Sequence, residues 1–116
     1  MCSSDLSPEI MGFGPVDASR RALALAGMQI GDMDLVEINE AFAAQVIPSY
    51  RELGIDIDRL NVHGGAIALG HPFGSTGARI TTTLLNGLAS RDKEWGLETM
   101  CVGGGQGMAM ILQRLS

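Results

Sequence analysis

The chain has 116 residues, of which 46% are hydrophobic but only 4% aromatic, so one small domain with an aliphatic core is expected. Its net charge is −5 and its eight Lys and Arg are scattered, which excludes a basic surface for nucleic acid. No apolar run reaches the roughly 18 residues of a membrane span. Two distant cysteines, Cys2 and Cys101, favour a reducing compartment, and we expect the cytoplasm.

The first predicted helix follows an irregular lead-in over residues 1–14. Pro15 suits the first turn of a helix and Asp17 its positive N-terminal end, while Gly27 suits the position just beyond its last residue. The predicted buried face of this helix consists of Ala18, Ala22, Leu25 and Ala26.

A short strand is predicted over residues 34–38, where β-branched and apolar residues alternate with acidic ones. A second helix is predicted over residues 40–53 and ends at Gly54, with Pro48 expected to remove one of its backbone hydrogen bonds. The predicted buried face of this helix consists of Phe42, Val46, Tyr50 and Leu53.

Residues 61–77 are rich in glycine and predict a very short strand that becomes a loop. A third helix is predicted over residues 75–90, where apolar and small residues recur at helical spacing. Two strands, over residues 95–102 and 108–112, form a hairpin through a run of glycines. Strands that alternate with helices predict an α/β fold with a mixed sheet, helices on both faces, and an antiparallel last strand.

Four places could carry chemistry, and most follow a predicted strand: Asn39 with Glu40, His63, His71 and Cys101. Ligands of open α/β sheets bind at the carboxyl ends of strands. A lone strand cysteine is more often a buried structural residue. The glycines after Cys101 favour a functional site instead, because their backbone N–H groups can face a ligand oxygen.

Each polar candidate also has a structural interpretation. His71 lies between Gly70 and Pro72, which can aim its ring for proton transfer, or it is a turn histidine bonded to local backbone. Asn39 either holds a water or a carbonyl group, or caps the following helix. His63 is the weakest candidate, because it can simply line the loop.

Two other site types are not supported by these motifs. The loop over residues 70–77 has no lysine after its glycine and is therefore not a phosphate-binding loop of the Walker type. The spacing of Cys101, His63 and His71 fits no paired ligand pattern, so no metal site is expected.

Three long motifs in this order resemble the thiolase family. They are the run Asn-Glu-Ala-Phe-Ala at residues 39–43, the glycine-rich run at 61–72 with Gly-Ala-Arg at 77–79, and the run Cys-Val-Gly-Gly-Gly-Gln-Gly at 101–107. Residues 11–15 also match a stretch that opens this region of the family. The resemblance covers residues 7–115. It implies a thiolase-like C-terminal half.

The resemblance implies transfer of an acyl group to or from coenzyme A by a Claisen-type mechanism. His71 would activate an acyl-accepting cysteine, and Cys101 would move the α-proton of acetyl-CoA. Asn39 would hold a water at the enolate oxygen, and the N–H group of Gly103 would contribute to a second oxyanion hole. Glu40 and His63 would support these four catalytic residues.

The resemblance also implies what lies outside this chain. The acyl-accepting cysteine belongs to an N-terminal half, which would be the partner of this chain, and the family forms homo-oligomers. Residues 1–6 look unrelated to the family, so residues 7–116 would be a partial C-terminal domain. The first strand of its sheet is expected to be missing from the middle, which would leave the chain inactive alone, poorly stable or self-associating.

The substrates implied are acyl-CoA and acetyl-CoA, within fatty acid metabolism and β-oxidation, with no tightly bound cofactor. Two alternatives stay open. One is a non-catalytic binding or assembly module that keeps the fold. The other is the 3-ketoacyl synthase group, which usually has a second histidine where this chain has Cys101.

Overall fold

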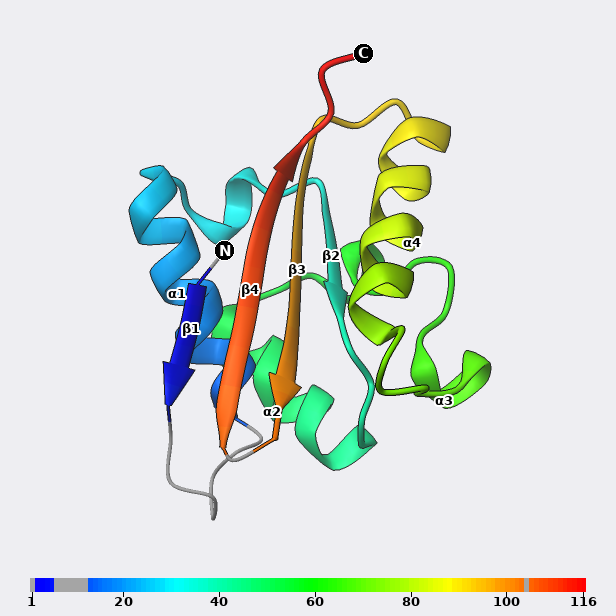
Figure 1. The fold of residues 1–116 in the computed structure, drawn as a ribbon. Coiled ribbons are helices and arrows are strands. Elements are labelled where there is room, and N and C mark those ends of the chain that lie inside the picture. Colours follow the sequence, from blue (N-terminus) through cyan, green and yellow to red (C-terminus); the bar gives the residue numbers. More distant parts are fainter. Residues whose placement is uncertain (1, 6–12, 104) are drawn as a thin grey trace.

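The computed structural model describes residues 2–5, 13–103 and 105–116. Their strands form one mixed sheet (Figure 1). Its strand order is β1-β4-β3-β2. The bounds are β1 Cys2–Asp5, β2 Leu35–Ile38, β3 Trp95–Val102 and β4 Gln106–Gln113. Strands β3 and β4 form the predicted antiparallel hairpin, and β2 pairs with β3 in parallel.

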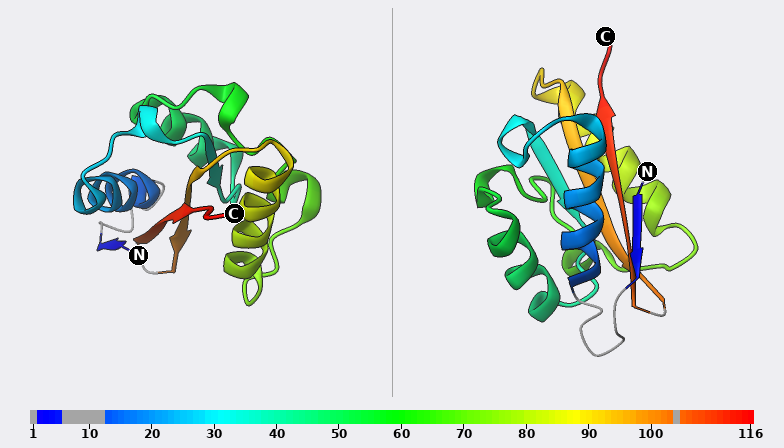
Figure 2. Two further views of the ribbon diagram at one scale, coloured as in Figure 1. Left: turned by 90° about the horizontal axis from the view of Figure 1, so that it is seen from above. Right: turned by 90° about the vertical axis from the view of Figure 1, so that its left-hand side faces the viewer.

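Helices cover both faces of this sheet (Figure 2). The bounds are α1 Gly14–Ala26, α2 Ala43–Leu53, α3 Ala66–Leu69 and α4 Thr76–Ser90, with 3₁₀ turns at Ile30–Asp32 and Ile57–Arg59. Side chains alternate between the two faces of a strand, and β3 shows which helix lies on which face. Thr99 donates to the Pro15 carbonyl of α1, whereas its neighbour Glu98 accepts from Thr81 of α4.

The apolar core is divided by the sheet into two clusters. The larger cluster joins α1, α2 and one face of the sheet, and includes Val16, Val46 and Leu97. The smaller cluster packs Leu84 and Leu88 of α4 against Leu35 of β2. The glycine pair Gly14 and Gly107 lets α1 approach β4 closely, because a Cβ at residue 107 would lie 2.0 Å from the Gly14 carbonyl oxygen.

The prediction of an irregular lead-in was wrong for residues 2–5. They form β1, which pairs antiparallel with β4 at the sheet edge in the register Cys2↔Ala109 to Asp5↔Gln106. The expected gap inside the sheet was also wrong for the described residues, because each strand is hydrogen-bonded to its neighbour. The instability expected from that gap therefore loses its physical basis.

The buried faces of the first two helices were partly mispredicted. Leu25 is 81% exposed and Leu23 is buried in its place, and Phe42 is 68% exposed. Helix α2 begins at Ala43 rather than residue 40, since the polar residues before it make tertiary contacts instead. The short strand near residue 61 is reduced to one isolated bridge between Leu60 and Val36. The bounds of α4 and β3 were predicted correctly to within one residue.

Candidate active site

The parallel pairing of β2 and β3 brings two candidate residues to the same edge of the sheet. Ile38 lies opposite Thr99, and the backbone N–H of Asn39 donates to the Thr99 carbonyl at 2.9 Å. Asn39 therefore directly follows β2. Cys101 is the second-last residue of the neighbouring strand β3, just before the glycines. This is the carboxyl edge where ligands of α/β sheets bind.

Asn61 fixes the backbone just before this edge. Its side-chain oxygen accepts from the Ile38 N–H at 2.9 Å, and its amide nitrogen donates to the Ile38 carbonyl at 2.9 Å. The same nitrogen donates to Glu40 at 3.1 Å. Asn61 has a backbone φ of 47°, a left-handed conformation that asparagine tolerates better than most residues. It was not predicted as a site residue, because only the folded chain brings it to β2.

The side chain of Asn39 is fully buried and does not cap a helix, since α2 begins three residues later than predicted. Its oxygen Oδ1 accepts from Arg79 Nη2 at 3.4 Å. Its nitrogen Nδ2 lies 3.5 Å from His71 Nδ1 and 3.4 Å from His71 Nε2, nearly equidistant from the two ring nitrogens. The capping interpretation of Asn39 was therefore wrong, and its carboxamide faces the histidine.

The ring of His71 is held by side chains rather than by local backbone. His71 Nδ1 lies 2.7 Å from Thr76 Oγ1, and that hydroxyl donates to the Pro72 carbonyl at 3.1 Å. A hydroxyl has a single hydrogen, so when Thr76 donates to Pro72 it accepts from the histidine. That arrangement puts the hydrogen on Nδ1 and leaves a lone pair on Nε2, the form required of a general base. Phe73 packs edge-on against the ring at 4.8 Å.

A cavity of about 480 Å³ lies between the start of α2 and the end of β3, within the range of small-molecule sites. Its walls are mostly apolar. The lining residues are Ala41, Phe42, His71, Phe73, Met100, Cys101, Val102 and Gly103. Three of the predicted catalytic residues, His71, Cys101 and Gly103, therefore line one cavity. The fourth, Asn39, is not among the lining residues but contacts His71.

Cys101 is a buried free thiol in the wall of this cavity. Burial raises the pKa of its thiol above the ordinary value, because a thiolate loses hydration there. The thiol is therefore protonated at neutral pH in this chain. It can act as a proton donor directly, and as a base once a neighbouring positive or donor group stabilises the thiolate.

Glu40 ties the loop that precedes His71 to the sheet edge. Its carboxylate accepts from the Ile67 N–H at 3.0 Å and from Asn61 at 3.1 Å. Gly65 is required there, because a Cβ at this position would lie 2.3 Å from the Glu40 carboxyl carbon. Glu40 thus makes structural contacts around α3 and is not among the cavity residues.

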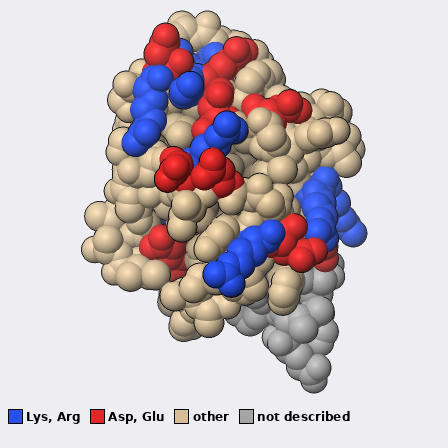
Figure 3. Space-filling model, turned by 180° about the vertical axis from the view of Figure 1, so that it is seen from behind, with Lys and Arg blue, Asp and Glu red and all other residues tan. Residues whose placement is uncertain are grey.

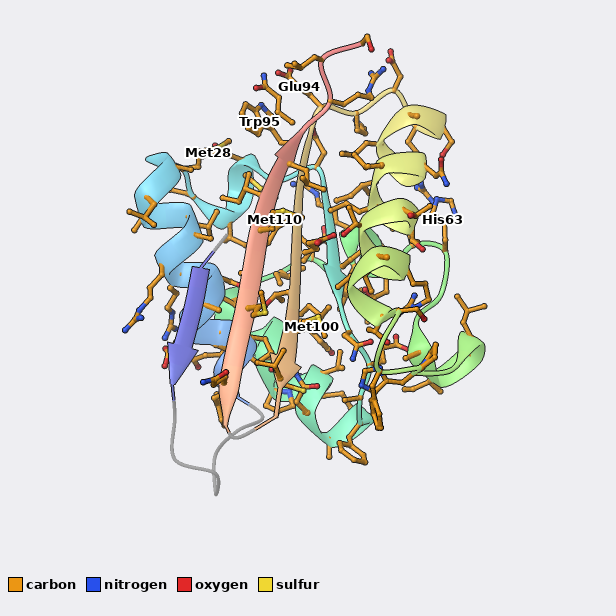
Figure 4. All side chains as sticks on the ribbon, viewed as in Figure 1. Met28, His63, Glu94, Trp95, Met100 and Met110 are labelled. Carbon is orange, nitrogen blue, oxygen red and sulfur yellow. The ribbon has the colours of Figure 1, made fainter. Side chains whose placement is uncertain are left out.

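The structure does not bring His63 to the cavity. His63 is exposed, and its ring lies near Gly87 of α4, beside that helix (Figure 4). Met100, by contrast, is at the β3 end near the cavity (Figure 4). His63 is not among the residues that line the cavity, so its predicted supporting role stays a prediction. Within residues 2–5, 13–103 and 105–116, no cluster of acidic, Cys and His side chains is suited to a metal ion.

Comparisons with known proteins show the family of this chain. Residues 1–114 match the model of the thiolase C-terminal domain. Acetyl-CoA acetyltransferase of Escherichia coli K12 is 55% identical over 114 residues, which cover 98% of this chain and 29% of that protein. This chain belongs to the thiolase family.

Other thiolases show the same relationship. The 3-ketoacyl-CoA thiolase of Vibrio vulnificus YJ016 is 51% identical over 98% of this chain and 30% of its own length. Human mitochondrial 3-ketoacyl-CoA thiolase superposes with a TM-score of 0.96 at 50% identity, over 99% of this chain and 29% of that one. A structure of that human enzyme in complex with CoA matches equally well. The thiolase domain described here thus spans just under a third of these relatives.

Proposed function

We propose that this thiolase domain supplies the proton-transfer groups for moving an acyl group to or from coenzyme A. The reaction would cleave a 3-ketoacyl-CoA with CoA to give acyl-CoA and acetyl-CoA, or run the reverse condensation. The observation that supports this most is that His71 and Cys101 line one cavity while Asn39 contacts the histidine. The relatives' names, acetyl-CoA acetyltransferase and 3-ketoacyl-CoA thiolase, support the same reaction class.

The role proposed for His71 follows from the lone pair on Nε2. It would take the proton of an acyl-accepting cysteine thiol, whose sulfur then attacks the thioester carbonyl and releases CoA as a thiol. That cysteine would come from an N-terminal half of the protein, because Cys101 is assigned to a different step. The 116-residue chain alone is therefore proposed to be inactive.

The role proposed for Cys101 is to move a proton at the α-carbon. In condensation, its thiolate would remove an α-proton of acetyl-CoA, and the resulting carbanion would attack the acyl-cysteine carbonyl and expel the cysteine sulfur. In cleavage, the Cys101 thiol would return the proton to the departing acetyl-CoA carbanion. The raised pKa of the buried thiol suits the donor form of this residue.

Two sites are proposed to stabilise negative oxygen atoms. Asn39, through a water, and His71 would face the enolate oxygen of acetyl-CoA. The Gly103 N–H would face the oxyanion of the tetrahedral intermediate, since Gly103 lines the cavity and its missing side chain leaves the backbone approachable. Glu40 would hold the loop geometry without moving protons.

The substrates proposed are acyl-CoA and acetyl-CoA, with no tightly bound cofactor. The CoA complex of the human relative supports a CoA thioester as ligand. Exposed Phe42 and Phe73, at 68% and 84%, put apolar surface at the cavity mouth. We further propose β-oxidation or a related pathway of fatty acid metabolism, a homo-oligomer, and a cytoplasmic location. In the part of the chain that the structure describes, no helix is long and apolar enough to cross a membrane.

A chimaera tests this proposal. This chain would replace the matching segment of Escherichia coli acetyl-CoA acetyltransferase, and thiolysis of acetoacetyl-CoA would be followed by loss of its absorbance. We expect activity in the chimaera, and none in the 116-residue chain. Variants His71→Ala and Cys101→Ser should each abolish turnover, while Cys2→Ser should not. A folded chimaera without turnover would favour a non-catalytic binding module.

A further inference from the structure

A buried polar cluster lies behind the cavity, on the face of the sheet covered by α4. Glu37 of β2 and Glu98 of β3 lie opposite each other in the parallel register, with only 3% and 6% of their surfaces exposed. Glu98 accepts from Thr81 of α4 at 2.8 Å, and its other oxygen has no partner among the described residues. Two carboxyl groups in one buried site require a compensating charge or a proton.

Arg79 of α4 supplies the positive charge of this cluster. Its electrostatic attraction lowers the pKa of Glu37, against a larger effect of burial that raises that pKa to about 7. Charges of Glu40 and Glu98 raise it further. At neutral pH the Glu37 carboxyl is therefore partly ionised.

The first turn of α4 contacts both His71 and Asn39. Thr76, the first residue of the helix, accepts from His71, and Arg79, three residues later on the same side, donates to Asn39. Atoms Nε and Nη1 of Arg79 are buried without a hydrogen-bond partner among the described residues. One turn of helix thus reaches both members of the Asn39–His71 pair.

The chemistry of Arg79 selects one orientation of the Asn39 carboxamide. A guanidinium has five N–H donors and no acceptor, so it can face only the oxygen of the amide. With Oδ1 on Arg79, the Asn39 nitrogen faces His71 and lies at nearly equal distances from its two ring nitrogens. The flipped amide would place its N–H₂ against the guanidinium, a repulsive contact between two donors.

We propose that Arg79 is a positioning residue, which fixes the Asn39 amide so that its N–H₂ faces His71. The catalytic consequence rests on the proposed function, whereas the orientation itself does not. Arg79 is not among the residues that line the cavity. Its effect on turnover must therefore pass through Asn39.

The first experiment tests the orientation by NMR spectroscopy of the 116-residue chain and needs no activity. In the native chain, we expect a nuclear Overhauser effect between the Asn39 amide hydrogens and His71 Hε1, because the amide nitrogen lies within 3.5 Å of both ring nitrogens that flank this carbon. This signal should vanish in Arg79→Met and persist in Arg91→Met, which removes an exposed arginine at the end of the same helix. A signal that survives in folded Arg79→Met would overturn the proposal.

The second experiment is a double-mutant cycle in the chimaera. Arg79→Met should lower kcat about tenfold to a hundredfold with KM nearly unchanged, the cost of a small misplacement of a catalytic group. Arg79→Lys keeps the charge and a donor, and should recover part of kcat even if the methionine variant folds poorly. In an Asn39→Ala background, Arg79→Lys should have no further effect on kcat.

The outcomes separate the positioning role of Arg79 from the proposed function of the chain. Equal losses from Arg79→Lys with and without Asn39 would show a general structural role and overturn the positioning role. An inactive native chimaera would contradict the proposed function while the NMR result still decides the orientation. A KM that rises with unchanged kcat would place Arg79 in substrate binding and contradict the proposal.

Discussion

The two ends of the sheet differ in the burial and hydrogen bonding of their polar side chains. At the end near Trp95 and the C-terminus (Figure 4), polar groups are at least partly exposed and make short contacts. Asp34 accepts from the Trp95 N–H at 2.9 Å, and Arg114 pairs with Asp92 at 2.6 Å. At the cavity end, Asn39 is fully buried, yet its contacts to His71 and Arg79 are 3.4–3.5 Å long.

Under the proposed function, the long contacts at the cavity end are a loss of stability that accompanies the catalytic residues. Burying a polar group without good hydrogen bonds costs free energy, so such groups are retained where they have another use. On the face in Figure 3, acidic and basic side chains are interspersed without a block of one sign. The predictions below test whether the cavity end alone carries function.

The largest effect is expected from His71. His71→Asn should reduce kcat of the chimaera about a thousandfold, because removal of a general base typically costs 10²–10⁴ in rate. Stability should change little, since the ring is only partly buried. Thiolysis assays and thermal melts measure the two quantities. His63→Asn is the matched control, and a similar loss from it would contradict the assignment.

The next effect concerns Glu37 and pH. Its folded pKa of about 7 lies above the ordinary value of 4.5, so the folded state binds more protons between these values. Stability should therefore be highest below pH 4.5 as far as this group is concerned, and fall as pH rises to 7, by roughly 3 kcal/mol. Burial raises the pKa of Glu98 too, which acts in the same direction.

Glu37→Gln should remove the part of the pH dependence that Glu37 contributes, since an amide does not titrate. The part contributed by Glu98 should remain. Urea unfolding of the native chain and the variant at pH 5 and pH 8 measures it. The free energy of unfolding of the variant should exceed that of the native chain at pH 8 and approach it at pH 5. A native pH profile that rises over this range would contradict the assignment.

Asn61→Ala should destabilise the chain by about 2 kcal/mol, because it leaves the Ile38 carbonyl and N–H without their side-chain partners. It should also lower kcat of the chimaera, as Asn39 and Glu40 follow directly in the chain. Urea unfolding and thiolysis report the two effects. Loss of stability with full activity would show that Asn61 does not position the cavity residues.

Asp34→Ala tests the opposite end of the sheet and should have the smallest effect. Asp34 accepts from the N–H groups of Glu94 and Trp95, and these bonds lower the pKa of its carboxyl. Its exposure limits the loss to about 1 kcal/mol of unfolding free energy. Activity at 25 °C should remain native. A loss of kcat would contradict the functional contrast between the two ends.

The sequence predicted where Asn39 and Cys101 lie in the fold better than it predicted the residues that surround them. Asn39 and Cys101 were placed at strand ends by local pattern, and the parallel pairing of β2 and β3 brought those ends together. The helical spacing of Ile80, Leu84 and Leu88 likewise predicted the buried face of α4. Such features depend on residues close in sequence, so periodicity reveals them.

The remainder depends on partners distant in the chain. Asn61 bonds across 23 residues to Ile38, and Arg79 across 40 residues to Asn39, so neither role leaves a local signal. Residues 2–5 lack an apolar pattern and become a strand only because β4 offers a free edge. Leu25 was placed on the buried face because a helix rich in alanine gives a weak periodic signal.

The central claim is that Cys101 moves the α-proton while His71 serves the acyl-accepting step. The most direct measurement is deuterium exchange into the methyl group of acetyl-CoA in D₂O, together with acetylation of the chimaera by mass spectrometry. We predict that Cys101→Ser is still acetylated but no longer catalyses exchange. Exchange at the native rate in Cys101→Ser would contradict the account.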